Sequence, residues 1–454
     1  MKNFLKPNQI KKDIQSLEKW GKDWTNGYEV NPSLIVFPEE NTQVVEIVKF
    51  AINNNLKLVP SGGRTGLSGG AVASNQEIVV SFDRMNKILD FCEKDRIVKC
   101  QSGLITKNLQ DFALSKDLFY PVDFASSGSS QIGGNIATNA GGIRVIRYGN
   151  TRNWVTGLKV ITGEGKLLDL NSGLVKNATG YDLRHLFIGS EGTLGMICEA
   201  EIALTKTQPS QRVMLLGVEE VKKLTKILEV FSNKITLSAF EFFSDLCLNK
   251  VKDRQEINPP FSKGHSFYAL IEFNESDIKE ASEAFEICLD QNFINDGILT
   301  TNEAQSKKIW KLRESISESL SPYMPYKNDL SVKVGLVPEF LKEVDNYVNT
   351  SFPEFEVCWY GHIGDGNLHL NILKPENLSI EEFNEYGHSM SPEIFNIIKN
   401  KKGSISAEHG VGILKRNFLE YSRSPSEIDY MVSLKKIFDP HQILNPGKLL
   451  PLDN

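Results

Sequence analysis

The feature that most constrains this chain is a glycine-rich stretch at residues 60–71, which reads Pro-Ser-Gly-Gly-Arg-Thr-Gly-Leu-Ser-Gly-Gly-Ala. It directly follows the short apolar run 56–59, which predicts a strand that leads into a loop. Glycine lets a backbone approach a ligand closely, and consecutive N–H groups form a concave site for anions. The stretch therefore predicts a phosphate or pyrophosphate loop, and a flexible linker is the alternative.

This loop does not match the common nucleotide-binding motifs. No G-x-G-x-x-G can be aligned with it, and the sequence contains no G-x-x-x-x-G-K-[ST]. The Rossmann and Walker mechanisms therefore have no support here, which argues against NAD and for a phosphate loop of another fold.

Two more glycine-punctuated stretches follow, at residues 120–149 and 180–195. Several such loops in one domain indicate a large cofactor that is contacted along its length, with tight packing between two subdomains as the alternative. Strands are expected at 34–37 and 56–59, with a helix between them that Thr42 could cap, so the first loop ends a β-α-β unit. Residues 104–117 are expected to form a helix.

Two features of the sequence mark the end of this first region. Residues 154–162 and 166–170 predict a hairpin across Gly163-Glu-Gly165. Near residue 207 the composition changes to alternating strands and amphipathic helices, which predicts a domain boundary.

Composition excludes several classes of protein. At 454 residues two or three domains are expected. A net charge of −6 without a long basic run argues against a nucleic-acid partner. No apolar run reaches the roughly 18–20 residues of a membrane span, and the start lacks a secretory signal. Six cysteines without a C-x-x-C predict reduced, mostly buried thiols and a cytoplasmic protein.

The three glycine stretches together resemble the flavin-binding domain of the vanillyl-alcohol oxidase / p-cresol methylhydroxylase superfamily. Within it the chain is most similar to the FAD-linked D-2-hydroxyacid dehydrogenases, and among these to the D-2-hydroxyglutarate dehydrogenases. The resemblance implies an α+β protein with a two-subdomain FAD-binding domain and a substrate (cap) domain built on an antiparallel sheet. The expected regions are an N-terminal wrap at 1–28, the FAD-binding domain at 29–207, the substrate and metal domain at 208–425, and a returning C-terminal segment at 426–454.

The resemblance also implies which residues contact FAD. The first stretch would hold the pyrophosphate, and the later ones would line the rest of the flavin. The first histidine of the chain is His185, and residues 101–197 contain no cysteine, so we expect a non-covalent flavin. The expected contacts are Pro60, Ser61, Gly62, Gly63, Arg64, Thr65, Gly66, Leu67, Ser68, Pro121, Asp123, Gly128, Ser129, Gly133, Gly134, Asn135, Ala137, Thr138, Asn139, Gly141, Gly142, Gly189, Glu191, Gly192, Ile197 and Asn445.

A second motif lies in the later part of the chain. Residues 359–371 place His362 and His369 on either side of Gly364-Asp-Gly366, and apolar residues flank both, which predicts two strands joined by a tight turn. Residues 404–412 add Glu408 and His409. Two imidazoles and a carboxylate are the ligand set of a catalytic zinc site, whereas two buried core histidines are the alternative. Asp365 is expected to be a turn residue.

The family resemblance strengthens the metal interpretation. His362, His369 and Glu408 match the family's metal-ligand positions. Zinc is the first choice, and manganese, iron or cobalt would accept the same ligands. His409 matches the catalytic base, which also contacts the substrate.

Substrate contacts are implied mainly by the resemblance. From the residues alone, the helix that carries Arg313 and Ser317 favours an ordinary solvated surface. The family matches Arg313, Ser317, Lys327 and Asn371 to substrate-binding positions, with Ser317 replacing a threonine. Two cations and a metal suit a dicarboxylate, because a monocarboxylate would leave one cation unpaired.

The expected activity is oxidation of a D-2-hydroxyacid, first D-2-hydroxyglutarate to 2-oxoglutarate, with hydride transfer to flavin N5. D-lactate, D-malate or glycolate are alternative substrates. Alternatives of other classes are a metal-dependent hydrolase, a flavin-dependent ether-lipid synthase and a non-catalytic flavin-binding module. The family implies an electron-transferring flavoprotein or a quinone as electron acceptor, and a homodimer is possible.

Overall fold

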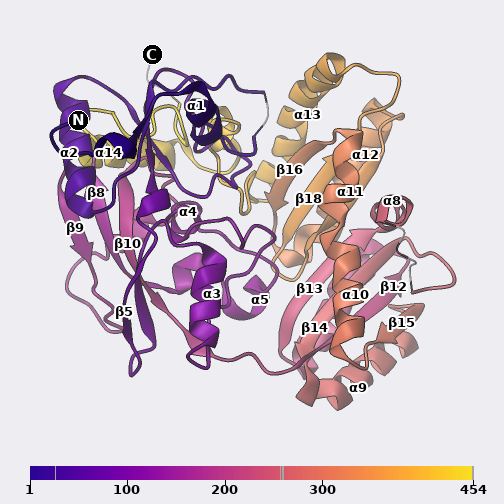
Figure 1. Ribbon diagram of the computed structural model, residues 1–454. Helices are drawn as coiled ribbons and strands as arrows, with labels where there is room; N and C mark the ends of the chain where they lie inside the picture. Colours follow the sequence, from indigo (N-terminus) through magenta and orange to yellow (C-terminus); the bar gives the residue numbers. More distant parts are fainter. Residues whose placement is uncertain (26, 256, 258–259, 452–454) are drawn as a thin grey trace. The chain divides into compact units, whose positions relative to one another are not determined.

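The computed structural model describes residues 1–25, 27–255, 257 and 260–451, which form two compact units (Figure 1). The first unit contains residues 1–142, 149–207 and 408–454, and the second contains residues 143–148 and 208–407. Two segments thus lie in a different unit from the one that the sequence analysis assigned to them. Residues 143–148 group with the second unit, and residues 408–425 group with the first.

The first sheet of the first unit is mostly parallel, in the order β1-β2-β4-β3. Its elements are β1 (Ile10–Lys11), β2 (Leu34–Val36), α2 (Asn41–Asn53), β3 (Leu58–Ser61) and β4 (Ile78–Ser81). The expected β-α-β unit is confirmed, because β2 and β3 both run parallel to β4. The expectation that Thr42 caps the helix is wrong. Glu40 occupies the N-cap position without a side-chain bond, and Thr42 lies inside the helix, where its hydroxyl donates to the Glu40 carboxylate.

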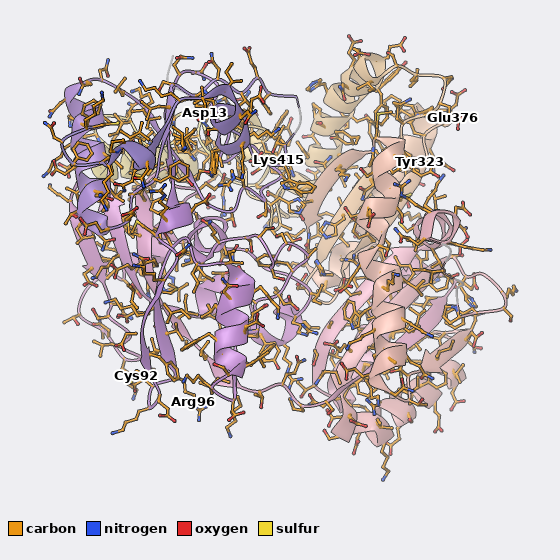
Figure 2. The ribbon with its side chains drawn as sticks, viewed as in Figure 1. Asp13, Cys92, Arg96, Tyr323, Glu376 and Lys415 are labelled. Carbon is orange, nitrogen blue, oxygen red and sulfur yellow. The ribbon has the colours of Figure 1, made fainter. Side chains whose placement is uncertain are left out.

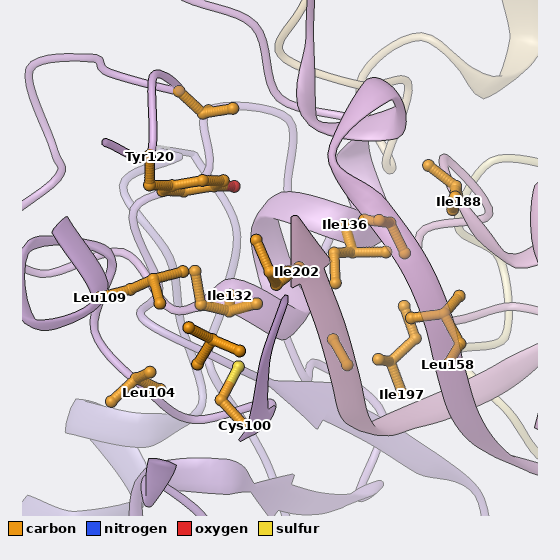
Figure 3. Packing of buried hydrophobic residues seen from close by; sticks show 14 of the residues in the cluster. Cys100, Leu104, Leu109, Tyr120, Ile132, Ile136, Leu158, Ile188, Ile197 and Ile202 are labelled. Carbon is orange, nitrogen blue, oxygen red and sulfur yellow. The ribbon is translucent and has the colours of Figure 1, made fainter. Parts of the chain in front are cut away.

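The second sheet of this unit is antiparallel, in the order β5-β6-β10-β8-β9. Its strands are β5 (Ile88–Cys92), β6 (Ile97–Gln101), β8 (Val155–Thr162), β9 (Leu167–Leu170) and β10 (Gly195–Ala203). The predicted hairpin is confirmed as the β8–β9 pair. Behind this sheet, Ile132 and Ile136 of α4 (Ile132–Thr138) join Cys100, Leu158 and Ile202 in a buried cluster (Figure 3).

The other elements of the first unit are short or peripheral. The C-terminal segment extends the parallel sheet, because Leu58 N donates to Ile443 O at 2.7 Å and Asn445 N donates to Leu58 O at 2.7 Å. The predicted helix at 104–117 is present in a shorter form as α3. The bounds are α1 (Ile14–Trp20), α3 (Thr106–Leu114), β7 (Leu118–Phe119), α6 (Arg184–Phe187), β11 (Thr205–Lys206), α14 (Pro425–Phe438), and the 3-10 turns at Pro7–Gln9, Phe82–Arg84, Thr151–Asn153 and Arg416–Tyr421.

The second unit is built on a seven-stranded antiparallel sheet in the order β15-β12-β14-β13-β17-β18-β16. Helices α10 and α11 lie over one face of this sheet (Figure 1), and their apolar side chains pack there together with those of α8. Helix α7 packs on the sheet and against α9 and α12. The bounds are α5 (Val145–Tyr148), β12 (Gln211–Val218), α7 (Val221–Lys234), β13 (Leu237–Ser244), α8 (Asp245–Gln255), β14 (Phe267–Asn274), α9 (Ile278–Asp290), β15 (Asp296–Leu299), α10 (Glu303–Glu314), α11 (Ile316–Leu320), β16 (Tyr326–Ser331), α12 (Val337–Ser351), β17 (Val357–His362), β18 (Asn367–Ile372), α13 (Ile380–Asn400), and the 3-10 turns at Glu275–Asp277, Ser321–Tyr323 and Val334–Leu336.

Helix α10 is fixed on this sheet by polar contacts as well as by apolar packing. Trp310 Nε1 donates to Glu272 Oε2 at 2.9 Å, and Glu272 on β14 also pairs with Arg144 at 3.0 Å. Three residues further along the helix, Arg313 forms an ion pair with Glu241 on β13 at 2.8 Å. Positions three apart lie on the same side of a helix, so two neighbouring strands hold α10 in one register.

The cysteines agree with the sequence analysis. All six cysteines are free, and five of them are buried. Cys92 is exposed at the end of the β5–β6 hairpin, near Arg96 (Figure 2). Within the described part of the chain, no helix combines the length and the apolar character that a bilayer span requires.

Replacing Trp310 with phenylalanine tests how α10 is held. The change keeps most of the apolar packing but removes the N–H that bonds to Glu272, so we expect a loss of about 1–3 kcal/mol in the free energy of unfolding. Urea-induced unfolding measures the difference. Trp24→Phe is the matched control, because Trp24 is 73% exposed and should change stability by less than about 0.5 kcal/mol. Equal effects of the two substitutions would contradict a role for the Trp310–Glu272 bond.

Candidate functional site

The first glycine stretch packs against both the second and the third in the first unit. A Cβ built on Gly63 would lie 2.3 Å from Ser129 O, and one on Gly192 (φ +71°) would lie 2.5 Å from Pro60 Cγ. Side chains larger than hydrogen are therefore excluded at both positions. The alternative of tight packing accounts for these glycines.

Other glycines face open space. A Cβ on Gly128 or on Gly134 would meet no atom within 4 Å among the described residues. Buried polar atoms at or beside the stretches that have no hydrogen-bond partner within the described part of the chain include Ser61 Oγ, Gln131 Oε1 and Asn445 Oδ1. Buried polar groups in native proteins are normally bonded, so these atoms fit a bound polar ligand such as FAD.

Arg64, the cation of the first loop, is paired with a carboxylate. Its Nη1 donates to Gly62 O at 2.7 Å and lies 3.3 Å from Asp83 Oδ1. Asp83 also accepts from Trp20 Nε1 at 2.7 Å and from Gln131 Nε2 at 2.8 Å. Asp83 thus links the loop to the N-terminal segment and to the start of α4, and the Arg64 charge is balanced within the protein.

Several polar residues of the second stretch also have partners in the protein. Asn135 Nδ2 donates to Thr106 Oγ1 at 2.6 Å, Thr138 Oγ1 donates to Gly134 O at 3.2 Å, and Asn139 Oδ1 accepts from Arg152 N at 2.9 Å. These hydrogen bonds hold α4 and its C-terminal end in place. The bonded atoms already have partners within the protein, so a cofactor contact would use the other polar atoms of these residues. Ile197 lies in β10 and is buried in the core cluster.

The third stretch positions the loop that carries the predicted catalytic base. The buried Glu191 carboxylate accepts from Val411 N and Gly412 N, both at 2.7 Å. Burial raises the pKa of Glu191, and these two hydrogen bonds oppose the rise. In the same unit Ser68 Oγ donates to His409 O at 3.0 Å, and Asn445 Nδ2 donates to Gly70 O and to Glu191 O. These bonds are the physical reason that residues 408–412 group with the first unit.

In the second unit, four adjacent strands present polar residues on one face of the sheet. Side chains alternate between faces along a strand, and the pairing sets Tyr360 opposite His369, and His369 opposite Asp329. Strands β13 and β17 are antiparallel and pair Phe242 with Gly361, so the preceding residue of β13, Glu241, lies opposite the following residue of β17, His362. The residues that share this face are Glu241 on β13, Tyr360 and His362 on β17, His369 and Asn371 on β18, and Lys327 and Asp329 on β16.

The two histidines meet as the sequence predicted. The hairpin β17–β18 pairs His362 with Asn367 around the turn, and Asp365 Oδ1 accepts from Asn367 N at 3.1 Å, which confirms Asp365 as a turn residue. The two imidazole rings lie 5.3 Å apart between centroids, with their planes at 83°. Two histidines that ligate one tetrahedral ion, each with a metal–nitrogen distance of about 2.1 Å, require centroids roughly 5 Å apart. The measured separation of the two rings matches that distance, and the metal-ligand role of the pair stays a prediction.

The Nδ1 atom of each ring lies near a carboxylate. His362 Nδ1 lies 2.7 Å from Glu241 Oε1, and because an ionised carboxylate only accepts, Nδ1 donates and Nε2 is left as the ligand atom. His369 Nδ1 lies 3.7 Å from Asp329 Oδ1, which is long for a hydrogen bond but suits two atoms that bind one cation. Asp329 is held by Asn367 Nδ2 at 2.7 Å and by Ala407 N at 3.1 Å.

The predicted substrate residues gather around Tyr360. The guanidinium carbon of Arg313 lies 4.7 Å from the centre of the Tyr360 ring, and the ring of His369 lies 4.9 Å from it. Burial raises the pKa of the Tyr360 phenol, whereas the Arg313 charge and hydrogen bonds to Ser317 and Asn371 oppose the rise. Arg313, Ser317 and Asn371 therefore converge on one buried ring.

Unpaired polar atoms occur at this place too. Asn371 Oδ1 and Arg313 Nε are buried and have no hydrogen-bond partner within the described residues. Lys327, on β16, is paired with Asn371 of β18. The residue as a whole is exposed, but the protein around its ammonium group removes part of the water and so lowers its pKa. Buried polar atoms in native proteins are normally hydrogen-bonded, so the unpaired donor of Arg313 and the unpaired acceptor of Asn371 indicate a binding site for a small polar ligand.

Glu408 and His409 belong to the first unit. Glu408 follows Ala407 in the chain, and Ala407 N is bonded to Asp329. His409 Nε2 lies 3.7 Å from Glu408 Oε1. The ligand role of Glu408 and the base role of His409 thus stay predictions that rest on the motif.

Sequence reasoning missed three residues of this face, namely Glu241, Asp329 and Tyr360. Tyr360 and Asp329 each lie two positions from a residue that was predicted, His362 and Lys327, and alternation along a strand could have placed them on the same face. Glu241 lies more than a hundred positions from His362, and only the β13–β17 pairing brings them together.

Comparisons with known proteins agree with this architecture. Residues 32–171 match the family described as FAD binding domain, and residues 207–449 match the family described as FAD linked oxidases, C-terminal domain. The D-2-hydroxyglutarate dehydrogenase of Stutzerimonas stutzeri (strain A1501) is 53% identical over 99% of this chain and 97% of its own length. The mitochondrial D-2-hydroxyglutarate dehydrogenase of Arabidopsis thaliana is 37% identical over 99% of this chain and 80% of its own.

The chain belongs to the FAD-linked D-2-hydroxyacid dehydrogenases. It is an oxidoreductase with an FAD-binding domain, so the readings as a hydrolase or as a non-catalytic module are set aside. A solved alkyldihydroxyacetonephosphate synthase shares the fold, with a TM-score of 0.75 at 19% identity over 99% of this chain and 85% of its own. A p-cresol methylhydroxylase does so with a TM-score of 0.76 at 12% identity over 100% of this chain and 96% of its own. The expected α+β fold of the vanillyl-alcohol oxidase type is confirmed.

Replacing Glu191 with glutamine tests how the 408–412 loop is held. A carboxamide has an acceptor at only one of its two terminal atoms, so it cannot reproduce the present arrangement, in which Val411 N donates to Oε1 and Gly412 N donates to Oε2. Losing one bond at about 1–2 kcal/mol should speed hydrogen exchange of at least one of these amides roughly tenfold or more. Glu201→Gln, on a partly buried glutamate of β10, should leave both amides unchanged. Unchanged protection in Glu191→Gln would contradict the role of this carboxylate.

Proposed function

We propose that the protein oxidises D-2-hydroxyglutarate to 2-oxoglutarate, using non-covalently bound FAD and a divalent metal, with zinc as the first choice. The observation that carries the proposal is one face of the seven-stranded sheet of the second unit, which holds the paired imidazoles and Lys327 and against which helix α10 places Arg313. Relatives at 53%, 46% and 37% identity over nearly the whole chain carry the name of this activity.

The proposed roles follow from the chemistry of the side chains. Oxidation removes a proton from the C2 hydroxyl and a hydride from C2. A bound flavin supplies the hydride acceptor, and a bound divalent metal supplies Lewis acidity that makes a hydroxyl easier to deprotonate. His362, His369 and Glu408 would hold the metal. His409, whose backbone is fixed by Ser68, would take the hydroxyl proton on its imidazole.

Two carboxylates of the substrate need two cations. Arg313 presents its buried, unpaired Nε, and Lys327 presents an ammonium group on the neighbouring edge strand. Asn371 and Ser317 add neutral hydrogen-bonding groups beside Tyr360. A monocarboxylate such as D-lactate or glycolate would leave one of the cations without an anion, which favours the five-carbon diacid or D-malate.

Three further parts of the proposal rest on the sequence and the family resemblance alone. They are electron transfer to an electron-transferring flavoprotein or a quinone, a cytoplasmic location and a homodimer.

Anaerobic reduction of the flavin tests the activity directly. On addition of D-2-hydroxyglutarate we expect the visible flavin band to bleach, because hydride transfer reduces the isoalloxazine. L-2-hydroxyglutarate should leave the band unchanged. Prior chelation should abolish bleaching and zinc should restore it, and His409→Ala should slow it by about 10²–10⁴-fold. No bleaching of the metal-loaded protein would rule out the proposed substrate.

Lys327→Ala tests the dicarboxylate assignment. Removing this cation should raise KM for D-2-hydroxyglutarate by roughly tenfold or more, because a charge-assisted contact contributes about 1.5–3 kcal/mol. The KM for D-lactate should change far less, since that substrate has no second carboxylate. Lys333→Ala, on a lysine outside the strand face, is the control. Equal losses for both substrates in Lys327→Ala would contradict the assignment.

A further inference from the structure

The Glu241 carboxylate contacts both a predicted metal ligand, His362, and a predicted substrate residue, Arg313. Its Oε1 accepts from His362 Nδ1 at 2.7 Å, and its Oε2 lies 2.8 Å from Arg313 Nη2. The side chain is fully buried on β13, at 0% exposure. An isolated carboxylate in such a place would be strongly unfavourable, so both partners are needed to balance it.

The two contacts orient their partners differently. The bond to His362 fixes the tautomer and the direction of the ring, which leaves Nε2 as the metal-facing nitrogen. The contact with Arg313 is an ion pair without good hydrogen-bond alignment, since Glu241 Oε2 is also among the buried atoms that lack a hydrogen bond. It holds the guanidinium by charge while Arg313 Nε stays unpaired for a ligand.

We propose, on the basis of the function proposed above, that Glu241 is a positioning residue that couples metal binding to recognition of the substrate carboxylate. One anion neutralises Arg313 and orients His362, so a change at either partner alters the charge balance of the other. Glu241 contacts neither flavin nor substrate in this role, and it acts through His362 and Arg313.

The chain contains a matched control for this proposal. Glu272, on the adjacent strand β14, is also buried, at 3% exposure, and it also contacts α10 and an arginine. Its partners are Trp310 and Arg144, neither of which is a predicted metal or substrate residue. Glu241→Gln and Glu272→Gln therefore remove equivalent buried charges, but only the first lies behind the site.

The test compares metal affinity and substrate kinetics in the two variants. The Glu241→Gln amide would turn a donor toward Arg313 and bind His362 more weakly. We expect zinc affinity of the flavin-loaded protein, measured by chelator competition, to fall tenfold to a hundredfold. KM for D-2-hydroxyglutarate should rise at least tenfold. In Glu272→Gln zinc affinity should stay within about twofold of the wild type, because Glu272 contacts no predicted metal ligand, although unfolding occurs at lower urea.

Glu241→Asp covers the case in which the glutamine variant does not fold. It keeps the charge but shortens the side chain, so zinc affinity should lie below that of the wild type. Wild-type zinc affinity and KM in the folded Glu241 variants, or an equal loss of zinc affinity in Glu272→Gln, would overturn the proposal. A wild-type protein that binds no zinc, or whose flavin is not reduced by D-2-hydroxyglutarate, would instead contradict the proposed function.

Discussion

The second unit depends on balancing two carboxylates that are buried side by side on its sheet. Glu241 and Glu272 lie on neighbouring strands and are nearly inaccessible to water. Each is matched by an arginine, and both contact helix α10. A buried ion pair rarely adds much stability compared with apolar packing, but breaking one is costly. The pairs therefore fix where α10 lies, and with it the guanidinium of Arg313 that faces Tyr360.

The first unit depends on a different constraint, because its glycine-rich loops have few side chains that could hold them in a fixed conformation. The glycine stretches pack on each other where a Cβ would collide, as at Gly63, and stay open at Gly128 and Gly134. Carboxylates hold these loops in place: the half-buried Asp83 pairs with Arg64, and the buried Glu191 accepts hydrogen bonds from the backbone N–H groups of residues 411 and 412. A rigid loop loses little entropy when it binds a ligand, which favours recognition of a large cofactor.

Local pattern was sufficient to predict a good part of this structure. The β-α-β unit, the β8–β9 hairpin and the meeting of His362 with His369 follow from periodicity and from glycine turns within a few residues. The bonding of Glu191 to residues 411 and 412, and of Glu241 to His362, could not be predicted, because partners more than a hundred positions apart are joined only by tertiary packing. The Thr42 cap failed for a local reason, since the helix begins at Asn41. Roles taken from the family motif for Glu408 and His409 stay predictions.

Metal binding by the imidazole nitrogens on the strand face of the second unit can be measured by X-ray absorption at the zinc edge of the zinc-loaded, flavin-containing protein. We expect scattering from two imidazole rings in the wild type and from one in His369→Ala, with oxygen completing the coordination. Coordination by oxygen alone, or an unchanged imidazole signal in His369→Ala, would contradict metal binding by these nitrogens.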